Sequence, residues 1–257
     1  MTQDGLGQVI AGMEREGDVF DAALPDCWMQ GRTAYGGASA ALALAAAQAA
    51  FPDLPPLRSA QVAFAGPLGR ALEIRPTLLR RGRSAGFVRV DVLSEGALGL
   101  SATLLFAAER PSGISHPPAP LTPVPVHGTP IVGPPDIAFV HNFDHAEAGV
   151  RTTGEARVRR WARIKDRSDL TPALELVAIA DVLPPPALLL ASRPGPISTM
   201  TWQLDLLAPT PATQDGWWLL SAEATSAENG FSSQAMAVWN ASGQAVAAAK
   251  QSVALFL

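Results

Sequence analysis

Apolar and polar residues alternate in several stretches of the chain, and this alternation predicts antiparallel strands. The clearest example is Phe87-Val88-Arg89-Val90-Asp91-Val92, a pattern typical of a strand with one buried face. Turn residues such as Gly66-Pro67 bound these stretches. The predicted strands cover residues 59–64, 73–80, 86–93 and 100–107, and then 199–206, 217–225, 231–239 and 245–256.

Two segments have helical character. Residues 36–50 are rich in Ala and Leu, which favour helix, and they begin with two glycines. In the second segment Ser168 or Asp169 is the expected N-cap of a helix with Pro172 in its first turn. Pro184-Pro185-Pro186 must end that helix. We therefore expect one helix before each set of strands.

A proline-rich stretch at residues 111–135, with little periodicity, separates two parts of similar layout. Residues 64–67 correspond to 206–209, and residues 92–96 to 239–243, which indicates an internal duplication. The predicted fold is α+β: a long helix in the curve of an antiparallel sheet, repeated twice. The predicted units are an N-terminal repeat at residues 1–110, a linker at 111–150 and a C-terminal repeat at 151–257.

The composition indicates a folded chain with a large core, because 48% of the residues are hydrophobic and 16% are charged. A net charge of −4 gives no global field for nucleic acid or an anionic membrane, so we expect neither as a partner. No stretch has the pattern of a membrane span, and Met1-Thr2-Gln3-Asp4 does not begin like a signal peptide. The expected location is the cytoplasm, and the single Cys27 excludes an internal disulfide.

Asp181 is the most informative candidate for chemistry. On the predicted helix it shares one face with Leu174, Val177 and Ala178, so an acid is expected on the buried stripe. Burial and the negative end of the helix dipole both raise the pKa of a carboxyl, toward the range of a general base. The alternative is a surface acid at a frayed helix end.

Gln251 is the second candidate, because it lies in an almost entirely apolar strand. Alternation places it on the same face as Val253 and Leu255. A buried amide needs partners and can orient a water molecule or a carbonyl group. The alternative is a polar residue on an exposed strand face.

Two further motifs could bind anionic groups. Gly36 and Gly37, at the start of the first helix, offer free backbone N–H groups for an anion or an oxyanion, although glycines also precede helices for simple turn reasons. A second motif is the arginine cluster Arg80, Arg81 and Arg83. These side chains could bind the phosphates of a nucleotide-bearing ligand, or could form the solvated edge of a sheet.

Other reaction classes lack their residues or the structural context that those residues need. The pattern Gly82-Arg83-Ser84-Ala85-Gly86 matches Gly-x-Ser-x-Gly, but it lies between two predicted strands and not before a helix, which argues against a serine hydrolase with a nucleophile elbow. His141 and His145 have the spacing of two metal ligands, but no third ligand is evident, so we expect no metal.

Together these residues resemble the acyl-CoA thioesterase family with two tandem hot-dog folds. Gly36-Gly37 resembles the start of the family's first helix, and Trp202 fits the strand that follows the second helix. Further matches are the turn Phe64-Ala65-Gly66-Pro67, the hairpin Arg81-Gly82-Arg83-Ser84, Ala180-Asp181 before the prolines, and residues 247–251 in the last strand.

The resemblance implies that the protein hydrolyses an acyl-CoA to a free acid and CoA, without a metal or redox cofactor. In this family an Asp, a Thr or Ser, and a Gln hold the attacking water. Here Asp181 and Gln251 match the first and third, and Ser198 or Thr199 supplies the hydroxyl if the strand before Trp202 is shifted.

The first predicted helix has no acid between residues 38 and 50, so we expect one site per chain, and association into a homo-oligomer stays open. Two alternatives remain open: a hot-dog protein that binds acyl-CoA or an acyl chain without cleaving it, and a hydratase or dehydratase.

Overall fold

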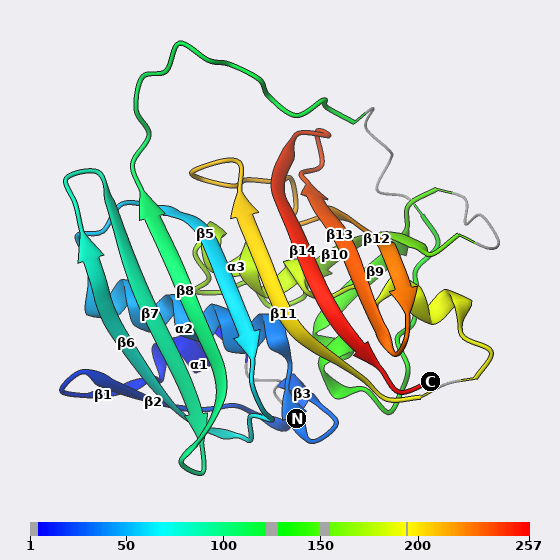
Figure 1. Ribbon diagram of the computed structural model, residues 1–257, viewed down its shortest axis with the longest axis horizontal. Helices are drawn as coiled ribbons and strands as arrows, with labels where there is room; N and C mark the ends of the chain where they lie inside the picture. The colour runs from blue at the N-terminus through cyan, green and yellow to red at the C-terminus, as the bar shows by residue number, and fades with distance from the viewer. Residues whose placement is uncertain (1–4, 122–127, 150–154, 194) are drawn as a thin grey trace.

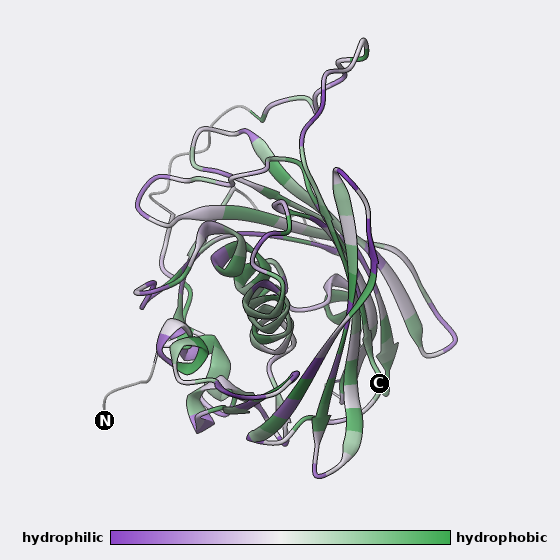
Figure 2. Ribbon diagram, turned by 90° about the vertical axis from the view of Figure 1, so that its left-hand side faces the viewer, coloured by the Kyte–Doolittle hydropathy of each residue, from purple (hydrophilic) through white to green (hydrophobic). Residues whose placement is uncertain are grey.

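Twelve strands form one antiparallel sheet that curves around two helices in the computed structural model (Figures 1 and 2). The structure describes residues 5–121, 128–149, 155–193 and 195–257. The strands of the first half are β1 (Glu14–Glu16), β2 (Val19–Ala23), β5 (Leu57–Phe64), β6 (Ala71–Arg81), β7 (Ala85–Ser94) and β8 (Ala97–Ala107). Those of the second half are β9 (Phe143–Glu147), β10 (Arg157–Ile164), β11 (Ile197–Leu206), β12 (Trp218–Glu228), β13 (Phe231–Trp239) and β14 (Ala245–Leu255).

The strand order of the sheet is symmetric about its centre. The order is β1-β2-β6-β7-β8-β5-β11-β14-β13-β12-β10-β9, so the second half repeats the first in reverse. The two halves join where β5 pairs with β11, and Val62 lies opposite Trp202 at this seam. The arrangement confirms the predicted fold class: two helices, each in the curve of an antiparallel sheet. The sequence pattern did not predict β1, β2, β9 and β10, which precede the helices.

The first long helix is α2 (Gly36–Ala50), with the bounds that the sequence predicts. Most of its residues are buried, and alanine dominates because the small side chain lets the sheet and α3 (Pro172–Ala180) pack closely around it. In Figure 2 the helices are seen nearly end-on, with the sheet curving around them. A short helix, α1 (Leu6–Ala11), and a small hairpin of β3 (Met29–Gln30) and β4 (Thr33–Ala34) precede α2.

The predicted N-cap of α3 is wrong. Thr171 is the N-cap, and its Oγ1 accepts a hydrogen bond from the backbone N–H of Leu174 at 3.4 Å. Asp169 lies in the preceding turn with a φ of 62°, a left-handed conformation that helix residues do not adopt. Pro172 occupies the first helical position as expected, because that position needs no N–H donor.

The described residues between the two halves first pass beyond the ends of the strands and then pack against the first half (Figure 1). Residues 108–121 arch beyond the ends of the strands (Figure 1). The short helices η1 (Asp26–Trp28) and η2 (Ala138–Asn142) then meet, and the Phe139 ring stacks on Tyr35 with centroids 4.2 Å apart. Residues 122–127 and the predicted boundary at 150/151 lie outside the described residues, as does the N-terminal tetrapeptide.

The inner face of the sheet forms the core. In β7, Val88, Val90 and Val92 are fully buried on this face, whereas Arg89 is exposed on the other. The observed alternation agrees with the sequence pattern. No helix in the described part of the chain is long and apolar enough to cross a bilayer.

Candidate active site

Asp181 lies where the end of α3 meets the start of α2. It follows α3 directly as the C-cap and is half-buried. The Nε2 amide of Gln251, on β14, donates a hydrogen bond to Asp181 Oδ1 at 2.5 Å. The backbone N–H of Gly37, in the first turn of α2, also donates to this carboxylate. The site therefore combines groups from both halves of the chain.

The surroundings raise the pKa of Asp181 to about 7 from its ordinary value of 3.8. Burial is the main cause, because an apolar environment disfavours the charged form. The hydrogen bonds from Gln251 and Gly37 act in the opposite direction, because they stabilise the carboxylate. A carboxyl with this pKa is suited to accept a proton near neutral pH.

Gly36 and Gly37 allow α2 to approach Asp181 closely. A Cβ atom on Gly36 would lie 2.6 Å from Asp181 Oδ2 and 3.1 Å from the Phe64 ring. A Cβ atom on Gly37 would lie 2.3 Å from the carbonyl oxygen of Ala178. The glycine pair predicts N–H groups that face a ligand, whereas the Gly37 N–H is directed to the Asp181 carboxylate.

Tyr35 connects the two helices next to this contact. Its hydroxyl donates a hydrogen bond to the carbonyl oxygen of Ala178, in the last turn of α3, at 2.8 Å. Burial, together with the nearby charge of Asp181, raises the pKa of Tyr35 well above its ordinary value. Tyr35 therefore stays protonated and holds the start of α2 against the end of α3.

Gln251 is buried, as its alternation with Val253 predicts. It lies between Trp202 on β11 and Gln234 on β13, directly opposite each in the sheet. Gln234 Nε2 donates a hydrogen bond to Gln251 Oε1 at 2.7 Å. Gln234 was not among the predicted site residues, although its place in the alternating strand at residues 231–239 puts a second amide on the inner face.

The two candidate hydroxyls lie on opposite faces of β11. Thr199 is paired with Val253, on the face of β14 that also carries Gln251, whereas Ser198 is paired with Ala254 and is exposed. A β-bulge between Thr199 and Thr201 shifts the register of the strand before Trp202. Among the described residues, neither candidate hydroxyl hydrogen-bonds to Asp181 or Gln251.

The three arginines lie at the opposite end of the first half-sheet from Asp181. Arg81 pairs with Gly86 on β7, and the cross-strand pairing continues through β8 to Leu57, at the start of β5. Arg81 and Leu57 therefore lie at the same end of the half-sheet. Phe64, whose ring faces Gly36, lies at the other end of β5, roughly 23 Å away at 3.3 Å per residue. Arg81 forms an ion pair with Asp53. The structure therefore does not bring Arg80, Arg81 and Arg83 to the Asp181 carboxylate, and their role in substrate binding stays a prediction.

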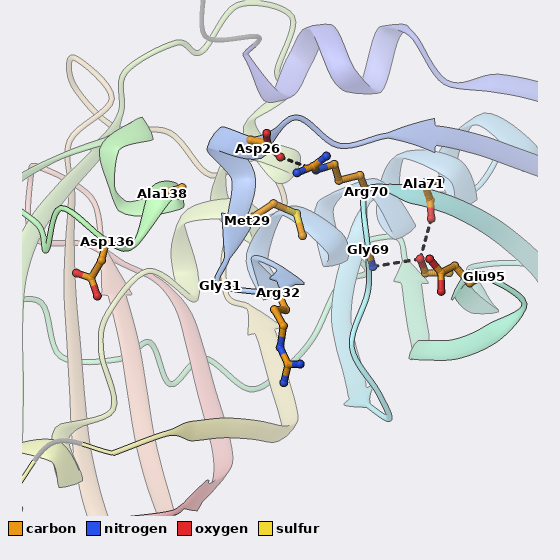
Figure 3. A pocket seen from close by; sticks show the side chains of 11 residues that line it. Asp26, Met29, Gly31, Arg32, Gly69, Arg70, Ala71, Glu95, Asp136 and Ala138 are labelled. Atoms are coloured by element: carbon orange, nitrogen blue, oxygen red, sulfur yellow. Dashed lines mark hydrogen bonds and ion pairs between the residues drawn. The ribbon is translucent and has the colours of Figure 1, made fainter.

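A pocket of about 660 Å³ opens beside the β3–β4 hairpin (Figure 3). Within it Arg70 forms an ion pair with Asp26, shown as a dashed line. Its charged lining residues are Asp26, Arg32, Arg70, Glu95 and Asp136. The carboxylates outnumber the guanidinium groups, so this pocket does not favour an anion. It shares no lining residue with the group around Asp181.

A curved antiparallel sheet that encloses a helix, present twice in one chain, defines a double hot-dog protein. A conserved protein of unknown function with a hot-dog fold from Alicyclobacillus acidocaldarius has this architecture, with a TM-score of 0.84 and 24% identity over 98% of both chains. A candidate thioesterase II from Thermobifida fusca gives a TM-score of 0.85 at 20% identity, over 100% of this chain and 99% of that one.

Sequence models identify the family. The model of the acyl-CoA thioesterase N-terminal domain matches residues 24–107, and that of the C-terminal domain matches residues 116–255. The chain therefore belongs to the acyl-CoA thioesterase family. A candidate thioesterase from Novosphingobium aromaticivorans is 26% identical, with a TM-score of 0.77 over 95% of this chain and 98% of that one. A comparison with curated protein sequences finds no match.

Proposed function

We propose that this protein hydrolyses an acyl-CoA thioester to a free acid and CoA, with Asp181 as the general base. The observation that carries the proposal is the Asp181 carboxylate, which has a pKa of about 7 and accepts hydrogen bonds from Gln251 and Gly37. Asp181 is half-buried, and this partial exposure supports access of a water molecule to it. Membership of the acyl-CoA thioesterase family supports the thioester as the substrate.

The proposed reaction balances without a redox cofactor. Asp181 takes a proton from a water molecule while the water oxygen forms a bond to the thioester carbonyl carbon. The C–S bond then breaks, its electron pair goes to the CoA sulfur, and Asp181 returns the proton to that thiolate. Gln251 has a second Nε2–H beyond the one bonded to Asp181, and this N–H orients the water.

The proposal is tested by CoA thiol release from short, medium, long and aromatic acyl-CoAs, with Asp181→Asn assayed in parallel. Release that requires Asp181 supports hydrolysis and reports the preferred acyl group. Saturable binding of an acyl-CoA without release from any substrate would instead support a non-catalytic binding protein. Conversion of an added 3-hydroxyacyl-CoA to the unsaturated acyl-CoA and water, with the thioester intact, would instead identify a dehydratase.

The rate of hydrolysis should depend on pH through Asp181. Because the pKa of Asp181 is about 7 and only the carboxylate accepts a proton, kcat/KM should fall about tenfold per pH unit below that value. The measurement is a profile of kcat/KM from about pH 5 to pH 9 on the preferred acyl-CoA. An acid limb near pH 4 would mean that the essential base is an ordinary exposed carboxylate.

Substitution of Thr199 should lower kcat more than substitution of Ser198. Thr199 shares the face of the sheet that carries Gln251, whereas Ser198 is exposed on the other face. We expect Thr199→Val to lower kcat about tenfold through loss of one hydrogen bond to the water, and Ser198→Ala to leave kcat unchanged. Steady-state kinetics of the two variants check this, and the reverse order would place Ser198 in the site.

A further inference from the structure

Gln234 is a buried amide that hydrogen-bonds to Gln251 and does not contact Asp181 directly by a hydrogen bond. It lies on β13, opposite Gln251 on β14, and is 0% exposed. Its Nε2 donates to Gln251 Oε1 at 2.7 Å and also lies 3.6 Å from the sulfur of Met236. The three side chains form a chain of donors from Gln234 through Gln251 to Asp181.

The direction of this chain follows from the chemistry of an amide. A glutamine side chain has a donor end and an acceptor end, and rotation by half a turn exchanges them. Gln251 must turn its donor end to the carboxylate of Asp181. With Gln234 in place, the opposite orientation would set the Gln251 oxygen against the carboxylate and its NH₂ against the NH₂ of Gln234. Both contacts would be repulsive, so Gln234 disfavours that orientation.

Gln234 is itself held in one orientation. Its second N–H faces the Met236 sulfur, a weak acceptor that would repel the amide oxygen. Its Oε1 has no hydrogen-bond partner among the described residues. A buried acceptor without a partner is costly, so a purely structural role does not explain an amide at this position. An apolar side chain of the same length would fit the inner face with Met236 and Val238.

We propose that Gln234 is a positioning residue: its amide fixes the orientation of Gln251 and, through it, the hydrogen bond that Gln251 donates to Asp181. This inference rests on the proposed hydrolysis, in which Asp181 and Gln251 hold the water. When Gln234 is absent, one of the two repulsive contacts is lost, so Gln251 can also turn its oxygen toward Asp181, an orientation that does not support the carboxylate. The hydrogen bond from Gln251 lowers the pKa of Asp181, so its partial loss raises that pKa further.

The test compares Gln234→Met and Gln234→Leu with Ser232→Ala, after thermal unfolding shows which variants are folded. Ser232 is the matched control, because it is buried on the same face of β13 and its hydroxyl has no partner in the described part of the chain. We expect the Gln234 variants to lower kcat about tenfold with little change in KM, and to move the acid limb of the pH profile up by about one unit. Ser232→Ala should match the unmodified protein.

A second measurement separates this inference from the proposed reaction. The carboxyl carbon of Asp181, assigned by its absence in Asp181→Asn, is titrated by NMR in the unmodified protein and in the Gln234 variants. A higher Asp181 pKa in the Gln234 variants supports the positioning role even if no acyl-CoA is hydrolysed. An unchanged pKa and an unchanged acid limb in a folded Gln234 variant would overturn it, even if Asp181 proves essential.

Discussion

Asp181→Asn should lower kcat/KM for acyl-CoA hydrolysis about 10³-fold, the usual contribution of a positioned general base. Asn has nearly the size of Asp, and its oxygen still accepts a hydrogen bond from Gln251 or Gly37, so the packing is retained while the proton acceptor is lost. The measurement is CoA thiol release by the folded variant, with acyl-CoA affinity determined separately. Retained affinity with lost turnover is the expected combination.

The same variant should also change how stability depends on pH. Because burial raises the folded pKa of Asp181 to about 7 from 3.8, the folded protein holds a proton that the unfolded chain releases between these values. This contribution to stability is present below about pH 4 and is lost as the pH rises through 7. The Tm of Asp181→Asn relative to the unmodified protein should therefore increase from about pH 4 to pH 8. A constant difference would show that Asp181 is not perturbed in the folded state.

Gly37→Ala should be the most destabilising of the small substitutions around the site. Its new Cβ would lie 2.3 Å from the carbonyl oxygen of Ala178 and 2.6 Å from the Tyr35 hydroxyl. The first neighbour is backbone, so the contact is relieved only if α2 and α3 move apart. Strain of this kind costs about 3 kcal/mol, which lowers Tm by roughly 6–12 °C in a protein of this size. Thermal unfolding measures the change.

Gly36→Ala is the matched control, one residue away on the same helix. Its Cβ would meet the Asp181 side chain and the Phe64 ring, which can rotate, instead of backbone. We expect a Tm loss less than half that of Gly37→Ala, together with a loss of activity because the Asp181 carboxylate is displaced. Equal Tm losses for the two variants would mean that the approach of the two helices does not limit stability at this point.

Local patterns in the sequence predict much of the fold. Alternation locates β7 because one face of that strand is buried along its whole length, and the Ala-rich composition locates α2 to the residue. Asp181 and Gln251 could be singled out because each is polar within an apolar pattern. Their contact could not be predicted from local patterns, since it joins residues 70 positions apart and depends on the fold.

The features that sequence reasoning missed depend on tertiary contacts. The pairing of β5 with β11 has no local signal, because either strand could equally be an edge. No residue type in the sequence marks the β-bulge before Trp202, so the face of the sheet on which Thr199 lies could not be assigned. Gln234 was detectable from alternation alone, but its role becomes visible only when β13 and β14 are paired in register.

The group around Asp181 joins Gly36 and Gly37 of the first half to Asp181 and Gln251 of the second. Two hot-dog units on separate chains would meet at a rate set by their concentration and would separate on dilution. Joining both units in one polypeptide replaces that encounter by an intramolecular one, with a fixed effective concentration. Assembly of the group around Asp181 is therefore independent of how much of the protein is present.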